Sequence, residues 1–251
     1  MAEDVEPVQL KPETLQAFED YIRDAEDAME QTLGGPAFLW CDGDPKRAKS
    51  VQQGKVAAEL WKGKSPAKAP FGLIHDWIGA VWIPGTTAAA TLACIQDYDR
   101  HKVMYRPEVI DSKLIARQGD DFQIYLRVLK KKIITVVLDT DHAVHYFQVD
   151  GTRWGCRSRT TRTAEVDNAG KPNEKVQPAD AGYGFLWRLN SYWRFEEREG
   201  CVLAECRAIS LTRDIPAALK WIIEPIVRSL PKDTLVNTLK ATRDAVRGRR
   251  G

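Results

Sequence analysis

Hydrophobic and polar side chains alternate along most of the second half of the chain. Apolar residues occupy every second position between residues 122 and 128, and the same period returns between residues 183 and 210. A period of two is typical of strands in a sheet whose two faces have different surroundings. Turn-forming residues separate these runs, so the pattern predicts an antiparallel meander of about six strands from residue 109 to residue 211.

Apolar residues recur at helical spacing near both ends of the chain. The first stripe predicts a helix over residues 12–33, and the second predicts a long helix that begins after Asp214 and continues to about residue 246. Shorter helices are expected after Asp44 and after Thr86 or Thr87, because aspartate and threonine are common N-caps. The expected class is therefore α+β.

Two neighbouring strands of this meander differ in the size of the side chains on one face. In the first, the residues that share a face are mostly large: Tyr183, Phe185, Trp187, Leu189, Ser191, Trp193 and Phe195. In the second they are small: Ala204, Cys206, Ala208 and Ser210. Charged residues occupy alternate positions, and if charge marks the water-facing side, the large and small sets both face the interior.

Small residues opposite aromatic residues, beneath a helix, leave space for a hydrophobic ligand. The alternative is a closed core. The residues predicted to line the pocket are Phe185, Trp187, Trp193, Phe195, Ala204, Cys206 and Ala208 from the strands, with Ile222 and Ile226 from the last helix. Polar candidates that would orient the ligand are Arg162, Tyr125 and Ser158, with a surface arginine as the alternative interpretation of Arg162.

The segment KGKSPAKAP (residues 62–70) is rich in residues typical of loops, and it marks the expected domain boundary. Residues 1–70 are interpreted as an N-terminal helical extension and linker, and residues 71–251 as the main domain. The extension is acidic. We expect its helix to pack on the main domain, and the alternatives are docking to a partner or plugging of the pocket.

Composition excludes several classes of protein. A formal net charge of +2 argues against binding of nucleic acid, and no apolar run is long enough to span a membrane. The start MAEDVEPVQL is unlike a signal peptide, so a cytoplasmic location is expected, or a periplasmic or secreted one if a leader has been removed. The five cysteines form no CxxC pair, and hydrolase, kinase and dinucleotide motifs are absent. No metal, cofactor or catalytic residue is therefore assigned.

A further segment resembles a known superfamily. The run PGTTAAATLACIQDYDRHKVMYRPEVIDSKLI places Pro84 before a helix that ends at Asp97-Tyr98, and Pro107-Glu108-Val109 leads into a strand. This order is similar to that of START-like, or SRPBCC, proteins, which include birch-pollen-allergen-like proteins, lipid-transfer domains and aromatic polyketide cyclases. The segments GLIHDWIGAVWIPG and YGFLWRLNSYWRFEE resemble a bacterial group within it whose activity is unknown. The resemblance covers residues 71–246 and implies a helix-grip fold, in which a curved antiparallel sheet wraps around the C-terminal helix.

The resemblance and the predicted pocket together favour binding or transport of a hydrophobic small molecule, either a lipid or a polyketide-like compound. One alternative is an enzyme of the cyclase or hydratase type, for which His75, Tyr105, His145 and Asp111 are the candidate acid and base groups. A second alternative is a protein-interaction module. The basic runs 130–132 and 62–68 are expected to be solvated turns, with transient contact with a membrane surface as the other interpretation.

Overall fold

The structure is a computed structural model that describes residues 7–63, 66–131, 135–214 and 220–248, and for residues 220–230 it describes the backbone only. Its helices are α1 (Pro12–Glu30), α2 (Pro45–Gln52), α3 (Ala88–Ile95), α4 (His101–Met104) and α5 (Lys220–Gly248). Short 3-10 turns cover Trp40–Gly43, Trp61–Gly63 and Tyr98–Arg100.

The main sheet has ten antiparallel strands among the described residues. Its path is β2 (Ala57–Leu60), β4 (Gly72–Pro84), β12 (Cys201–Arg213), β11 (Arg188–Arg198), β8 (Arg153–Asp167), β7 (Thr135–Gln148), β6 (Asp121–Lys131) and β5 (Val109–Gln118). Outside this path, β3 (Ala67–Ala69) pairs with β4 and β9 (Lys175–Val176) pairs with β8. A separate pair joins β1 (Val8–Gln9) to β10 (Ala181–Gly182).

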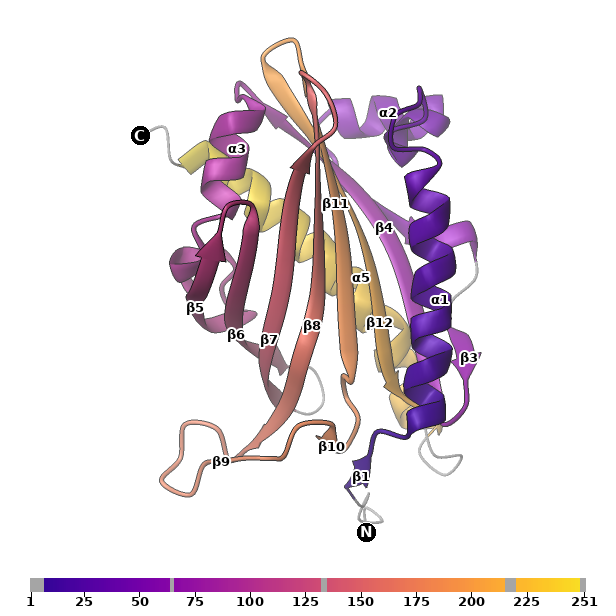
Figure 1. The fold of residues 1–251 in the computed structure, drawn as a ribbon, viewed down its shortest axis with the longest axis vertical. Coiled ribbons are helices and arrows are strands. Elements are labelled where there is room, and N and C mark those ends of the chain that lie inside the picture. Colours follow the sequence, from indigo (N-terminus) through magenta and orange to yellow (C-terminus); the bar gives the residue numbers. More distant parts are fainter. Residues whose placement is uncertain (1–6, 64–65, 132–134, 215–219, 249–251) are drawn as a thin grey trace.

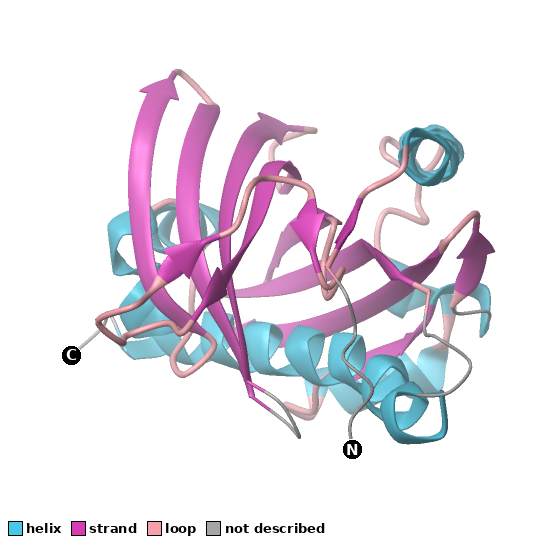
Figure 2. Ribbon diagram, turned by 90° about the horizontal axis from the view of Figure 1, so that it is seen from below, coloured by secondary structure: helices cyan, strands magenta, loops and turns pink. Residues whose placement is uncertain are grey.

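Helices cover both faces of this sheet. Figure 1 shows α5 crossing one face and α1 lying over β4 and β12, and Figure 2 shows the two helices on opposite sides of the sheet. The predicted α+β class is confirmed, as is the arrangement of a large antiparallel sheet against a long C-terminal helix.

Local sequence signals explain where the helices begin. Pro12 stands in the first turn of α1, where its missing N–H is no loss. Asp44 caps α2 by accepting from the backbone N–H of Lys46 at 2.8 Å, and Thr87 caps α3 by accepting from that of Ala90 at 3.2 Å. The predicted helix starts at these places are confirmed.

The N-terminal helix packs on the sheet and does not enter the space between the sheet and α5. Its apolar stripe, represented by Phe18 and Ile22, is buried against Ile74, Ile209 and Leu211. The expected structural packing of this helix is confirmed, and the plug interpretation is wrong because the helix lies on the other face of the sheet (Figure 2).

The expectation that charge marks the water-facing side of β11 and β12 is wrong. Glu205 and Arg207 of β12 are each 4% exposed, because the N-terminal segment covers them. Arg207 donates to both carboxylate oxygens of Asp76, at 3.0 and 2.6 Å, and Tyr21 of α1 donates to the same carboxylate at 2.8 Å. Buried charges are tolerated here because each has a hydrogen-bonded partner.

On the opposite face, the second half of α5 closes the main core. Leu235, Leu239 and Val246 of α5 are buried in one cluster with Val81 of β4 and Phe195 of β11. No helix in the part of the chain that the structure describes combines the length and apolar content of a membrane span.

Candidate functional site

The surface of the sheet that faces α5 has a row of small side chains in its middle. The strand register places Ala208 of β12 beside Ser191 of β11, and Ser191 beside Ser158 of β8. We call these three residues the central row. Trp77 of β4 borders the row on one side and Val144 of β7 borders it on the other.

The central row differs from its neighbours in accessibility. All three of its residues are only half-buried, although they lie on inner strands of the sheet. The next row toward the second half of α5 contains Cys206 and Cys156, which are 3% and 4% exposed. The face toward α5 is therefore closed at that row, and it keeps accessible surface at the central row.

The hydroxyl groups of the central row, those of Ser158 and Ser191, have no hydrogen-bond partner among the described residues. The wall beside them is aromatic: Trp193 stacks on Phe195 with ring centroids 5.7 Å apart and planes 2° from parallel. Such a surface combines apolar area with a few free polar groups, as small-molecule sites do.

Several of the predicted lining residues lie on this surface. They are Trp193, Phe195, Ala204, Cys206, Ala208 and Ser158. Ile222 and Ile226 belong to the part of α5 whose side chains lie outside the described residues. The role of all these residues in binding stays a prediction.

The predicted positions of Phe185 and Trp187 are wrong. Strand β11 begins only at Arg188, so the alternation of the strand does not extend back to these residues. Phe185 is 38% exposed and lies in the preceding turn with Tyr183, whose ring centroid is 5.9 Å away. Trp187 is buried on the α1 face, in the cluster that contains Phe18.

The predicted inward positions of Tyr125 and Arg162 are also wrong. A bulge interrupts the pairing of β7 with β8, so that Asp141 pairs with Arg162 and the next β7 residue pairs with Thr160. The bulge reverses the alternation and places Arg162 with Tyr125 on the face away from α5. Arg162 is 39% exposed and its Nη1 lies 3.4 Å from Asp141, while the Tyr125 hydroxyl donates to Asp139 at 2.7 Å.

The four residues expected for an acid–base pair do not meet: His75, Tyr105, His145 and Asp111. His75 is buried and Tyr105 is half-buried, and the side chain of each lies 3.1 Å from a threonine hydroxyl. Burial lowers the pKa of His75 to about 4, so its ring is neutral near pH 7. At the partly exposed surface, His145 Nδ1 lies 2.8 Å from Asp121, and Asp111 forms an ion pair with Lys102. No two of the four are bonded to each other in the described structure, and no described cluster has the composition of a metal site.

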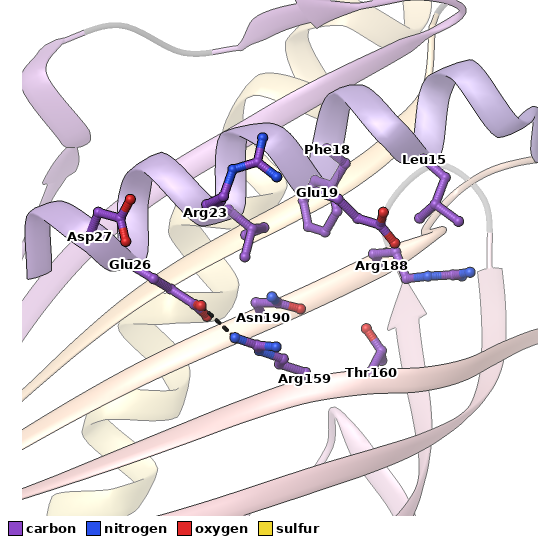
Figure 3. Close-up of a pocket in the computed structure, with 11 residues that line it drawn as sticks. Leu15, Phe18, Glu19, Arg23, Glu26, Asp27, Arg159, Thr160, Arg188 and Asn190 are labelled. Carbon is purple, nitrogen blue, oxygen red and sulfur yellow. Dashed lines mark hydrogen bonds and ion pairs between the residues drawn. The ribbon is translucent and has the colours of Figure 1, made fainter. Parts of the chain in front are cut away.

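A hollow that the sequence analysis did not predict lies between α1 and the sheet (Figure 3). It has a volume of about 320 Å3. The residues that line it are Leu15, Phe18, Glu19, Ile22, Arg23, Glu26 and Asp27 of α1, with Arg159, Thr160, Arg188 and Asn190 of β8 and β11. We call it the α1 pocket. The sequence signal for it is the acidic helix α1, whose Glu26 pairs with Arg159 of β8.

Sequence comparison finds no matching protein-family model and no matching curated protein. Several solved structures are similar. A STAR-related lipid transfer protein from Xanthomonas axonopodis is 19% identical, with a TM-score of 0.47 over 73% of this chain and 98% of that chain. A START superfamily protein from Mycobacterium smegmatis is 14% identical, with a TM-score of 0.48 over 69% and 98%. The Zhui aromatase/cyclase from Streptomyces sp. R1128 is 8% identical, with a TM-score of 0.48 over 71% and 96%.

These similarities concern the fold and assign no activity. The order of elements from β4 through α3, α4 and the antiparallel strands to α5 is the order expected of the superfamily named from the sequence. By its own sheet topology and terminal helix, the chain has a START-like, helix-grip fold.

Proposed function

We propose that the surface facing α5 binds a hydrophobic small molecule non-covalently, either a lipid or a polyketide-like compound. The observation that carries the proposal is the central row: three small, half-buried residues on adjacent inner strands, where a closed core would need bulk. Burial of the ligand would supply the affinity, at about 25 cal/mol per Å2 of apolar area.

The free hydroxyls of Ser158 and Ser191 would orient the ligand, since they lie beside the apolar wall and have no partner among the described residues. The proteins of similar fold include one named for lipid transfer and one named as an aromatase/cyclase. Those names describe the other two proteins. The proposal for this chain rests on the central row.

The proposal includes transient contact of the protein with an anionic membrane surface, where it would exchange its ligand. Lys62, Lys68 and Lys131 are exposed and available for such contact. Lys130 is not available, because its ammonium group pairs with Glu108 and donates to Thr234 of α5 at 2.9 Å.

Filling the central row tests the proposal. In Ala208→Trp the indole would occupy the space above Ser191, so binding of a fluorescent fatty acid should fall at least about tenfold, which corresponds to about 1.4 kcal/mol. The measurement is a fluorescence titration, together with native mass spectrometry of protein purified from its host to detect a co-purified ligand.

The matched control is Ala28→Trp, which adds the same side chain at an exposed position of α1. It should bind the probe as the parent protein does. Equal binding by the parent protein and a folded Ala208→Trp variant would contradict the proposal, as would the absence of any binding by the parent protein.

A further inference from the structure

Several hydrogen bonds at the α1 pocket involve Glu26 and its neighbours. The Tyr192 hydroxyl donates to Glu26 Oε1 at 2.6 Å, and Arg159 donates to Glu26 Oε2. Because the hydroxyl proton of Tyr192 is used in this way, its oxygen accepts from Asn190 Nδ2, at 3.2 Å. The amide nitrogen of Asn190 therefore faces Tyr192, and its carbonyl oxygen is turned away from Tyr192.

This carbonyl oxygen has no hydrogen-bond donor among the described residues, although Asn190 is 5% exposed and lines the pocket. The oxygen is not among the fully buried unpartnered atoms of the described residues, so it is open to the pocket and can accept from a ligand or from water. The neighbouring Thr160 hydroxyl is not free, since it donates to the carbonyl of Leu189 and accepts from the N–H of the same residue. The floor of the pocket thus presents one accessible acceptor that has no donor among the described residues.

The charges around the pocket leave a negative surplus. Each of the three lining arginines has a carboxylate partner: Arg23 with Asp20, Arg159 with Glu26, and Arg188 with Asp180. The two remaining lining carboxylates, those of Glu19 and Asp27, form no ion pair within the described part of the chain. Figure 3 shows Glu19 on the helix side of the pocket, across from the strands that carry Arg188 and Asn190.

The remaining wall is apolar. Phe18 and Ile22 are buried and Leu15 is half-buried, so the pocket combines a hydrophobic side with an unpaired carboxylate and an unpaired amide carbonyl. A ligand that matches all three features has an apolar body and a group that donates several hydrogen bonds and carries positive charge. An alkylammonium ion meets these requirements, and about ten non-hydrogen atoms fit 320 Å3 at the roughly 30 Å3 that each water occupies.

We propose that the α1 pocket binds a small organic ammonium ion with an apolar body, through the Glu19 carboxylate and the Asn190 carbonyl oxygen. This site is on the face of the sheet opposite the central row, so it is independent of the function proposed above. The ammonium group would lie between Glu19 and Asn190, and the hydrocarbon would lie against Phe18 and Ile22.

Three probes with six carbon atoms each test the proposal on the full chain: n-hexylamine, 1-hexanol and hexanoate. At pH 7 and low salt the protonated amine should bind about tenfold more tightly than hexanoate, with hexanol between them. Two-dimensional NMR should show the amine shifting the signals of the Asn190 side-chain amide and the Ile22 methyl groups. Equal binding of amine and hexanoate, or shifts confined to other parts of the protein, would overturn the proposal.

Variants separate charge recognition from folding. Glu19→Gln changes an exposed residue, so the fold should persist, and it should weaken the binding of hexylamine about fivefold or more while leaving hexanol unchanged. Glu13→Gln makes the same change on the same helix outside the pocket and should leave amine binding unaltered. If the two variants bind hexylamine equally well, the assigned role of Glu19 is wrong. Ala208→Trp should also retain amine binding, and its loss there would mean that the amine enters the site facing α5.

Discussion

Buried polar side chains on the α1 face tie the N-terminal segment to the sheet. Glu205 accepts from the backbone N–H of Cys41 at 3.1 Å, and Arg194 donates to the carbonyl oxygens of Phe38 and Met29. Burial of Glu205 raises its pKa to about 7, although Arg194 and the backbone donors act in the opposite direction. The residue thus holds its proton more tightly in the folded state than in the unfolded chain.

The raised pKa predicts that Glu205 makes stability depend on pH. Its contribution is fully present below about pH 4.5, where it is protonated in both states, and is lost as the pH rises through about 7. Glu205→Gln should remove this dependence, so the variant should be more stable than the parent at pH 8 by up to about 3 kcal/mol and similar near pH 4.5. Urea unfolding at both pH values measures the difference, and a variant with the same pH dependence as the parent would contradict the assignment.

At Gly79, strand β4 lies so close to α5 and β2 that there is no room for a side chain. A Cβ atom at Gly79 would lie 2.7 Å from the carbonyl oxygen of Ala57 in β2 and 2.8 Å from Cδ1 of Leu239 in α5. Glycine is therefore required where the edge strand, β4 and the helix meet. The sequence shows this glycine in a strand run but does not show the helix above it.

Gly79→Ala is expected to destabilise the protein by about 1–3 kcal/mol, because the added methyl group must displace backbone or the helix. Gly34→Ala is the control, since nothing lies within 4 Å of a Cβ atom placed there. Thermal unfolding of both variants is the measurement. Similar midpoints for the two would show that β4 and α5 are not in this close contact.

A single bulge accounts for the wrong assignment of Arg162. Alternation through residues 154–162 predicts one uninterrupted strand, but the extra residue at Thr161 moves Arg162 to the other face. The position of a bulge depends on pairing with a partner strand, which a single run of sequence does not contain.

The N-terminal helix completes the core of the protein on one side of the sheet. Without it, the apolar residues Ile74, Trp187, Ile209 and Leu211 would lose their cover, and Tyr21 would no longer reach Asp76. The part of the sheet that contains β4 and β12 thus lies between two helices that come from opposite ends of the sequence (Figure 2).

Deletion of residues 1–35 should therefore expose a contiguous apolar surface. We expect stronger binding of 8-anilinonaphthalene-1-sulfonate, a lower unfolding midpoint and self-association in size-exclusion chromatography. Phe18→Ala in the full chain should lower stability by about 3–5 kcal/mol without removing the cover. A truncated protein that stays monomeric with an unchanged midpoint would contradict this account of the helix.

The sequence by itself determined the class of the fold, the starts of α1, α2 and α3, and the small residues that face α5. These features depend on local chemistry: helix caps, periods of two and 3.6 residues, and side-chain size. It did not determine which charged residues are buried or that α1 covers the opposite face. Those outcomes depend on which segments, far apart along the chain, supply a partner for each charge, and only tertiary packing brings the partners together.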